Sequence, residues 1–512
     1  MASTKGIRSV IIASSVGTLI EWYDFYIFGS LATVLATQFF PKTNPTAALL
    51  STLATFAAGF VVRPFGALVF GRLGDLVGRK YTFLLTLIIM GGSTFAIGCV
   101  PNYETIGFAA PLLVLLFRLL QGLALGGEYG GAATYVAEHS PIEKRGFFTS
   151  WIQTTATLGL FISLGVILLT RHHLDADPAK SIAKFNDWGW RIPFLASIIL
   201  VIVSIYIRLR MAESPLFAQL KSEGKTSVNP LKESFGNKTN LKMVLLVLFG
   251  ATMGQGVVWY TGQFYAQSFI ENTCHIDFDQ SRTVIIWAIL FGTPFFVVFG
   301  ALSDKIGRKW ILITGMLLSV FTYRYLFGQL LETADTSTRT ELADKKQIKR
   351  ISTILPSNDT AINTTTSTYY TGGMVVNETL GDTLYAQAGR VSTHPVKKMS
   401  RVLGDGDYWK MVWIVFIMIL YVTMVYGPIA AFLVELFPTR IRYTSMSLPY
   451  HIGNGVFGGL TPFIATLLAT IYTADKLAGL MYPLIVVGVC AVIGILYINN
   501  RPAKDIDGPS SK

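Results

Sequence analysis

Two ten-residue stretches of the chain share one pattern: GRLGDLVGRK at residues 71–80 and GALSDKIGRK at residues 300–309. Both fit Gly-x-x-x-Asp-x-x-Gly-Arg-Lys, they begin 229 residues apart, and each lies between two long apolar runs. A charged turn that is repeated half a chain apart between apolar segments indicates two homologous bundles of membrane-spanning helices. Paired bundles of this kind are typical of solute carriers that work by alternating access.

The composition also indicates a membrane protein. Of 512 residues, 52% are hydrophobic and 14% are charged, whereas soluble proteins carry roughly 25% charged residues. Many apolar runs reach about 20 residues, the length of helix that spans a bilayer. The net charge of +12 does not indicate nucleic-acid binding, because the basic residues fall in short loops between the apolar runs.

The apolar runs predict an all-α membrane protein with twelve transmembrane helices in two six-helix bundles. We expect the first bundle at residues 1–210, a polar linker at 211–241, the second bundle at 242–498 and a tail at 499–512. The individual spans are expected at residues 10–37, 47–70, 81–100, 109–137, 148–170, 189–209, 243–270, 283–302, 310–331, 409–434, 446–471 and 479–498.

The distribution of basic residues predicts the orientation. Most Lys and Arg residues of the short loops and tails fall on the side that holds both termini and both copies of the repeated turn. Short cytoplasmic segments carry such an excess, so both termini are expected in the cytoplasm.

A second repeat reveals an insertion in the second half. Glu138 to Arg145 and Glu435 to Arg442 both read Glu-x-x-Pro-x-x-x-Arg, but they lie 297 residues apart rather than 229. The polar segment at about 332–408 is the place for the additional residues, and it is expected outside the membrane. It is interpreted as a partly ordered cap, with a flexible loop as the alternative.

Two carboxylates lie inside the first predicted span. Glu21 and Asp24 are three residues apart and therefore share a helix face. A charge at membrane depth costs about 2.5–3.5 kcal/mol on insertion scales, which favours a functional group or a paired one. A carboxyl group in a dry cavity gains proton affinity, so both residues are candidates for proton coupling. A structural ion pair is the alternative interpretation.

The fourth predicted span carries a polar face and a small-residue face. Arg118, Gln121, Leu125 and Glu128 follow the helical period on one side, while Gly122, Gly126 and Gly130 line another. Arg118 is a candidate partner for Asp24, and a guanidinium also matches a substrate carboxylate with two hydrogen bonds. A purely structural ion pair remains the other interpretation. The small residues allow a neighbouring helix to approach closely.

The seventh and eleventh spans offer further candidate substrate contacts. Polar and aromatic side chains that could line a cavity for a small polar solute are Gln255, Trp259, Tyr260, Gln263 and Asn454. Interfacial aromatics and helix–helix hydrogen bonds are the alternative explanation for the same pattern.

The repeated motifs predict a latch on the cytoplasmic side. Asp75 and Asp304 can accept hydrogen bonds at a facing helix N-terminus, and Arg79 and Arg308 can pair with Glu138 and Glu435. The remaining predicted members are two basic residues of the second repeat and three turn glycines: Arg145, Arg442, Gly71, Gly78 and Gly307. Ser303, where the first turn has Gly74, predicts looser packing in the second copy. The alternative is that the basic residues only fix topology.

The sequence contains no P-loop, nucleotide fingerprint, catalytic triad or zinc-binding spacing. We therefore expect no enzyme activity, no cofactor and no metal, and transport energy from an ion gradient or from the solute itself. The expected partners are a small metabolite, a proton and the lipid bilayer, and the expected oligomeric state is a monomer.

The two turns and the twelve spans resemble the major facilitator superfamily. Within it, the chain resembles the metabolite:proton symporter family through five stretches, which are EWYDF at 21–25, RPFG at 63–66, QGLALGGEYGG at 121–131, WRIPF at 190–194 and GQGVVWYTGQFY at 254–265. The resemblance covers nearly the whole chain apart from 332–408. It implies proton-coupled uptake of carboxylates or zwitterionic osmolytes across a bacterial inner membrane, with the proton site at Asp24 and Arg118.

These inferences together predict a secondary active transporter that couples proton entry to uptake of a small carboxylate or zwitterionic metabolite. Two alternatives stay open. One is an uncoupled facilitator or an exporter of the same fold, and the other is a nutrient sensor with a degenerate transport site. The short predicted tails disfavour the sensor.

Overall fold

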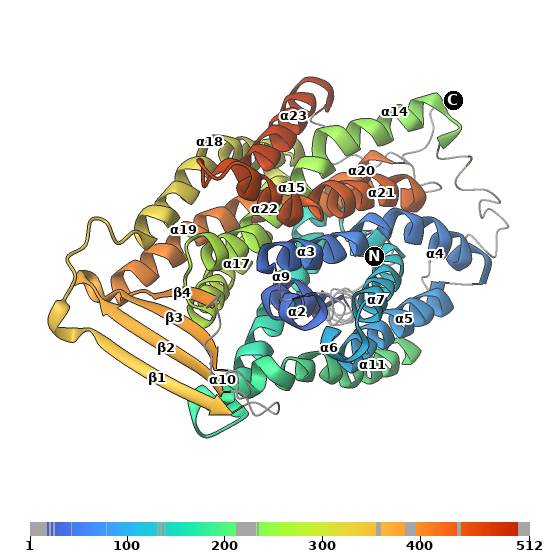
Figure 1. The fold of residues 1–512 in the computed structure, drawn as a ribbon. Helices are drawn as coiled ribbons and strands as arrows, with labels where there is room; N and C mark the ends of the chain where they lie inside the picture. The colour runs from blue at the N-terminus through green and yellow to red at the C-terminus, as the bar shows by residue number, and fades with distance from the viewer. Residues whose placement is uncertain are drawn as a thin grey trace, which may run out of the picture. The chain divides into compact units, whose positions relative to one another are not determined.

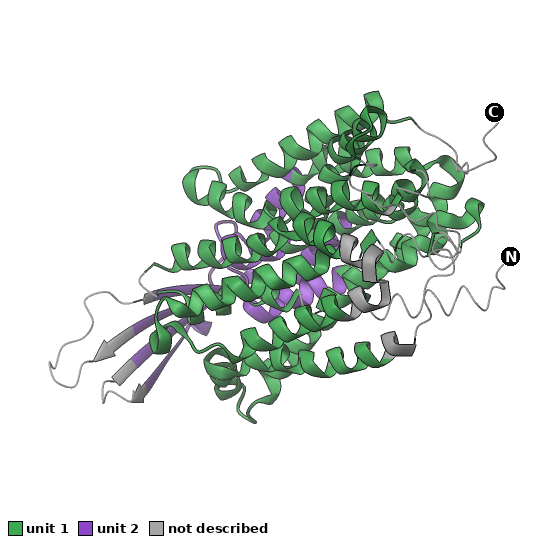
Figure 2. Cartoon of the chain, turned by 90° about the vertical axis from the view of Figure 1, so that its right-hand side faces the viewer, with its two compact units in different colours: residues 1–265, 289–323, 418–512 green, residues 266–288, 324–417 purple. Residues whose placement is uncertain are grey.

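The structure is a computed structural model drawn as a ribbon in Figure 1. It describes residues 18–19, 22–23, 26–41, 44–77, 79–127, 129–130, 133, 136–137, 140–210, 232, 235–354, 360–384, 396–437 and 442–499. The chain forms two compact units, which Figure 2 shows in different colours. Unit 1 comprises residues 1–265, 289–323 and 418–512, and unit 2 comprises residues 266–288 and 324–417. This division differs from the expected pair of bundles, which stays a prediction.

The helices from the first half of the chain belong to unit 1. They are α2 (Ala32–Phe39), α3 (Pro45–Val61), α4 (Arg63–Val77), α5 (Arg79–Cys99), α6 (Tyr103–Ile106), α7 (Ala109–Gly126), α9 (Arg145–His173), α10 (Pro178–Lys184) and α11 (Arg191–Arg210), with the 3₁₀ turn η1 (Ile142–Lys144) and the π-helical segment η2 (Phe185–Gly189). The start of α3 shows how the sequence sets a boundary. Asn44 accepts a hydrogen bond from the backbone N–H of Ala47 at 3.0 Å, and Pro45 occupies the first turn, where its missing N–H costs nothing.

The helices from the second half include several π-helical segments. One run consists of α14 (Lys238–Val247), η3 (Leu248–Thr252), α15 (Met253–Tyr260), η4 (Thr261–Tyr265), α16 (Ala266–Ser268) and η5 (Phe269–Thr273). The others are α17 (Phe278–Ile306), α18 (Arg308–Ala334), α19 (Asp405–Tyr426), α20 (Ile429–Leu436), α21 (Arg442–His451), π-helical η8 (Ile452–Gly458), α22 (Thr461–Ile471), 3₁₀ η9 (Ala478–Leu480) and α23 (Met481–Tyr497). Segments η3, η4, η5 and η8 are π-helical, a rare conformation that is frequent at functional sites.

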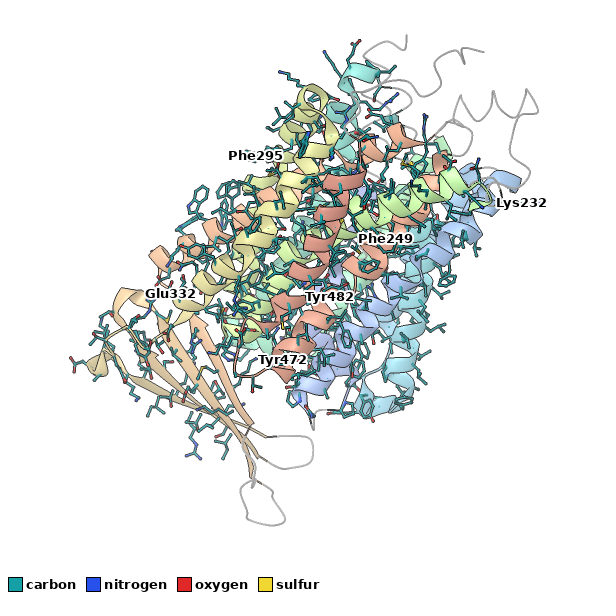
Figure 3. All side chains as sticks on the ribbon, turned by 90° about the horizontal axis from the view of Figure 1, so that it is seen from above. Lys232, Phe249, Phe295, Glu332, Tyr472 and Tyr482 are labelled. Atoms are coloured by element: carbon teal, nitrogen blue, oxygen red, sulfur yellow. The ribbon has the colours of Figure 1, made fainter. Side chains whose placement is uncertain are left out.

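The helices have the polarity pattern of a membrane protein. Large apolar side chains are exposed on the outside, including Phe65 at 61% and Phe321 at 77%, while Arg118 and Gln255 are fully buried. Figure 3 shows side chains covering the outer faces of the helices. Among the described residues, nine helices are long and apolar enough to cross a membrane, and they match nine of the twelve expected spans. A tenth expected span corresponds to a helix pair bent by 65° around Trp190.

Glycines allow close packing between helices of the first half. A side chain at Gly122 would collide with the carbonyl oxygen of Gly59, and one at Gly126 would collide with that of Arg63. The small-residue face expected on the fourth span is therefore confirmed at these two positions, where it brings α7 against α3 and α4.

Outside the helices, unit 2 contains a β-sheet that the all-α expectation did not include. Its strands are β1 (Gln347–Ile354), β2 (Thr360–Tyr369), β3 (Val375–Leu384) and β4 (Val396–Val402), in the order β1-β2-β3-β4 with antiparallel neighbours. The register pairs Lys349 with Thr365, and Thr365 with Thr379. β-Branched threonine and valine favour this pleated structure, and Gly372 with φ 81° makes the turn before β3.

The sheet is held to neighbouring segments of unit 2 by side chains and backbone. The backbone N–H of Arg401 in β4 donates to the carbonyl of His275 at 2.6 Å, and its guanidinium donates to the carbonyl of Cys274 at 2.8 Å. Arg339 donates to the carboxylate of Asp407 at 2.7 Å. The described residues of the insertion thus form an ordered sheet, as the interpretation of a partly ordered segment predicts.

Candidate functional site

Arg118 on α7 is completely buried inside unit 1. Its Nη1 donates to Oε1 of Gln121 at 2.7 Å, and Gln121 in turn donates to Oγ1 of Thr94 at 2.5 Å. The guanidinium also lies over two aromatic rings, with Cζ 4.5 Å from the centroid of Phe28 and 4.9 Å from that of Phe56. Arg118 is therefore fixed in orientation by a hydrogen bond and by ring faces that attract a cation.

Aromatic rings from both halves of the chain meet next to this arginine. Tyr26 from the first half stacks on Trp259 of α15 with centroids 5.7 Å apart, and Trp22 lies 6.1 Å from the same indole. Tyr260 packs edge-on against Trp259 at 4.8 Å. The ring of Phe264 connects this cluster to Phe56 at 5.3 Å, so the aromatic lining continues to the ring beneath Arg118.

A second buried arginine belongs to the same region. Arg63, which begins α4, is 2% exposed, and its Cζ lies 5.5 Å from the ring of Trp22 and 4.1 Å from that of Phe60. The backbone of Phe60, three residues before Arg63, packs directly on η8. A side chain at Gly455 would meet the carbonyl oxygen of Phe60 at 2.6 Å. Two guanidinium groups therefore lie in the interior of one unit.

Two predicted amides bind each other. Nε2 of Gln255 on α15 donates to Oδ1 of Asn454 in η8 at 3.2 Å, and Nδ2 of Asn454 donates back to Oε1 of Gln255 at 2.8 Å. Both side chains are buried, so this reciprocal pair fixes α15 against η8.

Other buried polar groups have no partner. Among the residues that the structure describes, Nε1 of Trp259, both amide atoms of Gln263 and both ring nitrogens of His451 make no hydrogen bond. These side chains are 1–3% exposed. An unpaired buried polar group costs free energy, so such groups point to a ligand that supplies the missing hydrogen bonds.

The four acidic candidates Glu21, Asp24, Glu128 and Glu138 lie outside the described residues, as does Gly78. Gly71, Asp75 and Arg79 fall in the helices α4 and α5, but at positions whose side chains are not described. The proton-coupling carboxylates and the first copy of the latch therefore stay predictions.

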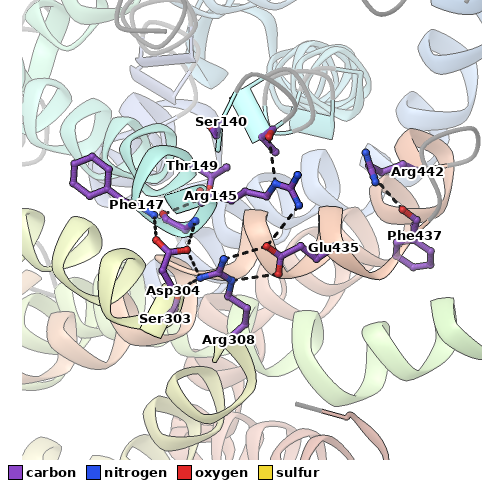
Figure 4. A network of polar contacts seen from close by, with 12 residues as sticks. Ser140, Arg145, Phe147, Thr149, Ser303, Asp304, Arg308, Glu435, Phe437 and Arg442 are labelled. Carbon is purple, nitrogen blue, oxygen red and sulfur yellow. Dashed lines mark hydrogen bonds and ion pairs between the residues drawn. The ribbon is translucent and has the colours of Figure 1, made fainter. Parts of the chain in front are cut away.

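In the second copy, the contacts expected of Asp304, Arg308 and Glu435 are present. Oδ1 of Asp304 accepts from the backbone N–H of Gly146, and Oδ2 accepts from that of Phe147, both at 2.8 Å (Figure 4). Gly146 and Phe147 lie in the first turn of α9, where backbone N–H groups have no partner within the helix. The carboxylate thus caps a helix from the other half of the chain, at the end of the helix dipole that favours an anion.

An ion-pair network surrounds this carboxylate. Arg308 contacts Asp304 at 2.6 Å and donates to both carboxylate oxygens of Glu435 at 3.1 and 3.3 Å. Arg145 from the first half reaches Glu435 at 3.8 Å (Figure 4). All four side chains are less than 10% exposed, so water screens these charges weakly.

The remaining latch residues have local roles. Gly307, with φ 95°, forms the left-handed turn between α17 and α18, and Nε of Arg442 donates to the carbonyl of Phe437 at 3.0 Å. The expectation of looser packing at Ser303 is wrong. Its hydroxyl donates to the carbonyl of Gly300 at 2.7 Å and accepts from Arg308 at 2.8 Å, so the extra oxygen ties the turn to the network.

Comparison with known proteins identifies transporters that are similar to this chain over most of its length. A family profile described as "Sugar (and other) transporter" matches residues 9–229. The inner membrane metabolite transport protein YhjE of Escherichia coli K12 is 30% identical over 470 residues, which cover 91% of this chain and 88% of that protein. The chain belongs to the major facilitator superfamily, among its sugar and metabolite transporters.

Two further relatives of this major facilitator protein are informative. The alpha-ketoglutarate permease of E. coli K12 is 30% identical over 90% of this chain and 87% of its own length, and the proline/betaine transporter of the same strain is 37% identical over 60% and 62%. A structure of the proton:xylose symporter XylE shares the fold, with a TM-score of 0.63 at 16% identity, covering 96% of this chain and 94% of that one. The protein is thus a multi-pass membrane transporter and not an enzyme.

The sequence reasoning missed one group of residues in this transporter. No role was predicted for Tyr129, Gln153, Tyr426 or Tyr450, yet these four side chains form a buried cluster. The second repeat could have identified two of these tyrosines by their spacing. Tyr129 precedes Glu138 by the same nine residues by which Tyr426 precedes Glu435.

Proposed function

We propose that this major facilitator protein is a proton-coupled symporter that takes up a small carboxylate or a zwitterionic metabolite. The observation that carries the proposal is the fully buried guanidinium of Arg118 in an interior lined by aromatic rings and amides. A fixed positive charge at membrane depth favours an anionic partner, and a carboxylate satisfies a guanidinium with two hydrogen bonds.

Asp24 is the proposed proton carrier. Phe28, whose ring lies beneath Arg118 at 4.5 Å, follows Asp24 by four residues, the spacing of one helical turn. We propose that Arg118 pairs with the ionised Asp24 in the empty transporter. Protonation of Asp24 would then release the guanidinium for the carboxylate of the substrate, with Glu21 as a second acidic group nearby in sequence.

The substrate would satisfy the buried groups that lack partners. Gln263 and the indole N–H of Trp259 offer donors and an acceptor for a small polar molecule, and the rings of Trp22, Tyr26 and Tyr260 would enclose its apolar part. The names of two relatives support this chemistry, because alpha-ketoglutarate is a dicarboxylate and proline and betaine are zwitterions.

The latch distinguishes the two states of the proposed cycle, because its contacts form in one state and are broken in the other. We propose that Asp304, Arg308, Glu435 and Arg145 hold the cytoplasmic side closed while the protein faces outward. Binding of proton and substrate would favour the state in which these contacts are broken, and only such a difference in stabilisation can drive the change. Both termini are proposed to lie in the cytoplasm of a bacterium, with the transporter working as a monomer in the inner membrane.

Uptake by energised membrane vesicles tests the proposal. Labelled dicarboxylates, betaines and sugars are compared with and without an uncoupler that abolishes the proton gradient. We expect a carboxylate or zwitterion to accumulate, and the uncoupler to remove the accumulation. Accumulation that survives the uncoupler would contradict proton symport, and equilibration without accumulation would favour the uncoupled facilitator.

A further inference from the structure

Four buried side chains form a cluster between the aromatic site and the latch. Nε2 of Gln153 on α9 donates to the hydroxyl of Tyr129 at 2.5 Å, and the hydroxyls of Tyr426 and Tyr450 share a hydrogen bond of 2.9 Å. The rings of Tyr129 and Tyr450 stack face to face, with centroids 3.6 Å apart and planes at 2°. All four side chains are less than 10% exposed.

The cluster obeys the internal repeat of the chain. Tyr129 and Tyr426 are 297 residues apart, and so are Gln153 and Tyr450, which is the spacing between Glu138 and Glu435. The hydrogen bond between Gln153 and Tyr129 is therefore the counterpart of the bond between Tyr450 and Tyr426. Each half of the chain contributes one hydrogen-bonded pair.

Along the helices, the cluster lies between the residues of the latch and those of the aromatic site. Tyr426, the last residue of α19, precedes Glu435 on the following helix α20 by nine residues. In the other direction, Tyr450 precedes Asn454 by one helical turn, and Asn454 binds Gln255 at the aromatic site. The ring of Tyr426 also lies 6.3 Å from that of Trp259. A molecule that moved from the site toward the latch would meet these rings first.

We propose that Tyr129, Gln153, Tyr426 and Tyr450 form a second, uncharged gate that closes the pathway between the substrate site and the latch. The inference rests on the alternating-access cycle proposed above. The rings of Tyr129 and Tyr450 stack across the two halves, and their hydroxyl groups also interact there. The bonds of 2.5 Å and 2.9 Å, in contrast, join residues of the same half. The halves can therefore separate here without leaving a hydroxyl group unpaired.

This arrangement suits a gate at membrane depth. A charged latch loses ion pairs when it opens, and desolvated charges are costly away from water. The tyrosine pair loses a stacking contact and the exclusion of water, while each hydroxyl keeps the partner that orients its ring. The two barriers thus differ in chemistry, and one can be weakened without touching the other.

A thiol placed just beyond the cluster tests the gate. Thr157 is fully buried one helical turn after Gln153, and it is 297 residues before Asn454, so it is the first-half counterpart of a site residue. Thr157→Cys is introduced after replacement of the three native cysteines by serine. A membrane-impermeant maleimide is then applied separately from each side of the membrane, without substrate and without a proton gradient.

The gate predicts a specific change in the labelling rate. With Tyr129→Leu or Tyr450→Leu, the thiol should react roughly tenfold faster from the latch side, the change expected for losing about 1.4 kcal/mol of stacking. Tyr450→Phe keeps the stack, so the labelling rate should stay within about twofold of the parent. Tyr323→Leu removes a buried tyrosine elsewhere in unit 1 and should leave the rate unchanged.

The result that would overturn the gate is an unchanged labelling rate in folded Tyr129→Leu or Tyr450→Leu protein, or an equal increase from Tyr323→Leu. If either leucine variant fails to reach the membrane, the other variant decides. The readout needs neither substrate nor protons. A failed symport assay with a positive labelling result would therefore overturn the proposed coupling and leave the gate intact.

Discussion

The carboxylate of Asp304 accepts a hydrogen bond from the backbone N–H of Gly146, a residue 158 positions earlier in the chain. The bond joins the repeated turn of the second half to the first turn of a helix from the first half. It explains why an acidic residue occupies this position of the motif, because a carboxylate satisfies free N–H groups and complements the helix dipole at once.

Removal of this carboxylate should expose the start of α9. In Asp304→Ala, the N–H groups of Gly146 and Phe147 lose their acceptor, at a cost of about 1–2 kcal/mol typical of a lost helix cap. Hydrogen exchange measured by mass spectrometry should therefore be faster in the peptide that covers residues 142–152. Asp344→Ala, at an exposed position of the insertion, is the control. Equal exchange in the wild-type protein, Asp304→Ala and Asp344→Ala would refute the role of Asp304.

The ion pair between Arg308 and Glu435 should show measurable coupling. Its bidentate geometry and low exposure predict a coupling free energy of about 1–3 kcal/mol in a double-mutant cycle of Arg308→Gln and Glu435→Gln. The measurement is equilibrium unfolding in mixed micelles. The control cycle removes the exposed pair of Lys346 and Glu341, which lies at 3.6 Å and should couple by less than about 0.5 kcal/mol. Similar values in the two cycles would argue against the latch.

The amide pair of Gln255 and Asn454 should respond asymmetrically to single and double substitution. Asn454→Leu leaves a buried amide without its partner, so stability should fall by about 1–3 kcal/mol. Adding Gln255→Leu removes the orphaned amide and should recover part of the loss. Thermal unfolding in detergent measures the effect. A double variant that is less stable than the single variant would show that the pair is not the source of the loss.

Gln263 should affect binding and not stability. Among the described residues its amide atoms have no partner, so Gln263→Leu removes no hydrogen bond from the empty protein. Stability should stay equal or rise, while KM for uptake should rise about tenfold because the substrate loses a hydrogen bond in a buried site. Asn454→Leu is the contrasting variant, with its expected loss of stability. An unchanged KM in Gln263→Leu would exclude the amide from the site.

Much of the helical part was predictable from the sequence because spans and repeats are local or periodic signals. The apolar runs identify the helices by length, and the motif copies at Asp304, Arg308 and Glu435 identify the latch by position. Close packing at Gly122 and Gly126 follows in the same way, because small residues recur at the helical period.

Features that depend on tertiary arrangement were not predictable. The sheet at 347–402 was not predicted, because β2 is rich in threonine and the strands show little alternation between polar and apolar residues. The contact of Arg145 with Glu435 and the stack of Tyr129 on Tyr450 join opposite halves of the chain. No local pattern states which helices of the two halves will face each other.

Proton flux driven by substrate tests the central claim most directly. Purified protein is reconstituted into liposomes that contain a pH-sensitive dye, and the substrate found in the vesicle panel is added outside. The account predicts acidification of the interior with wild-type protein and none with Asp24→Asn, while Asp344→Asn behaves like wild type. Substrate entry without proton entry, or full proton-coupled uptake by Asp24→Asn, would contradict the account.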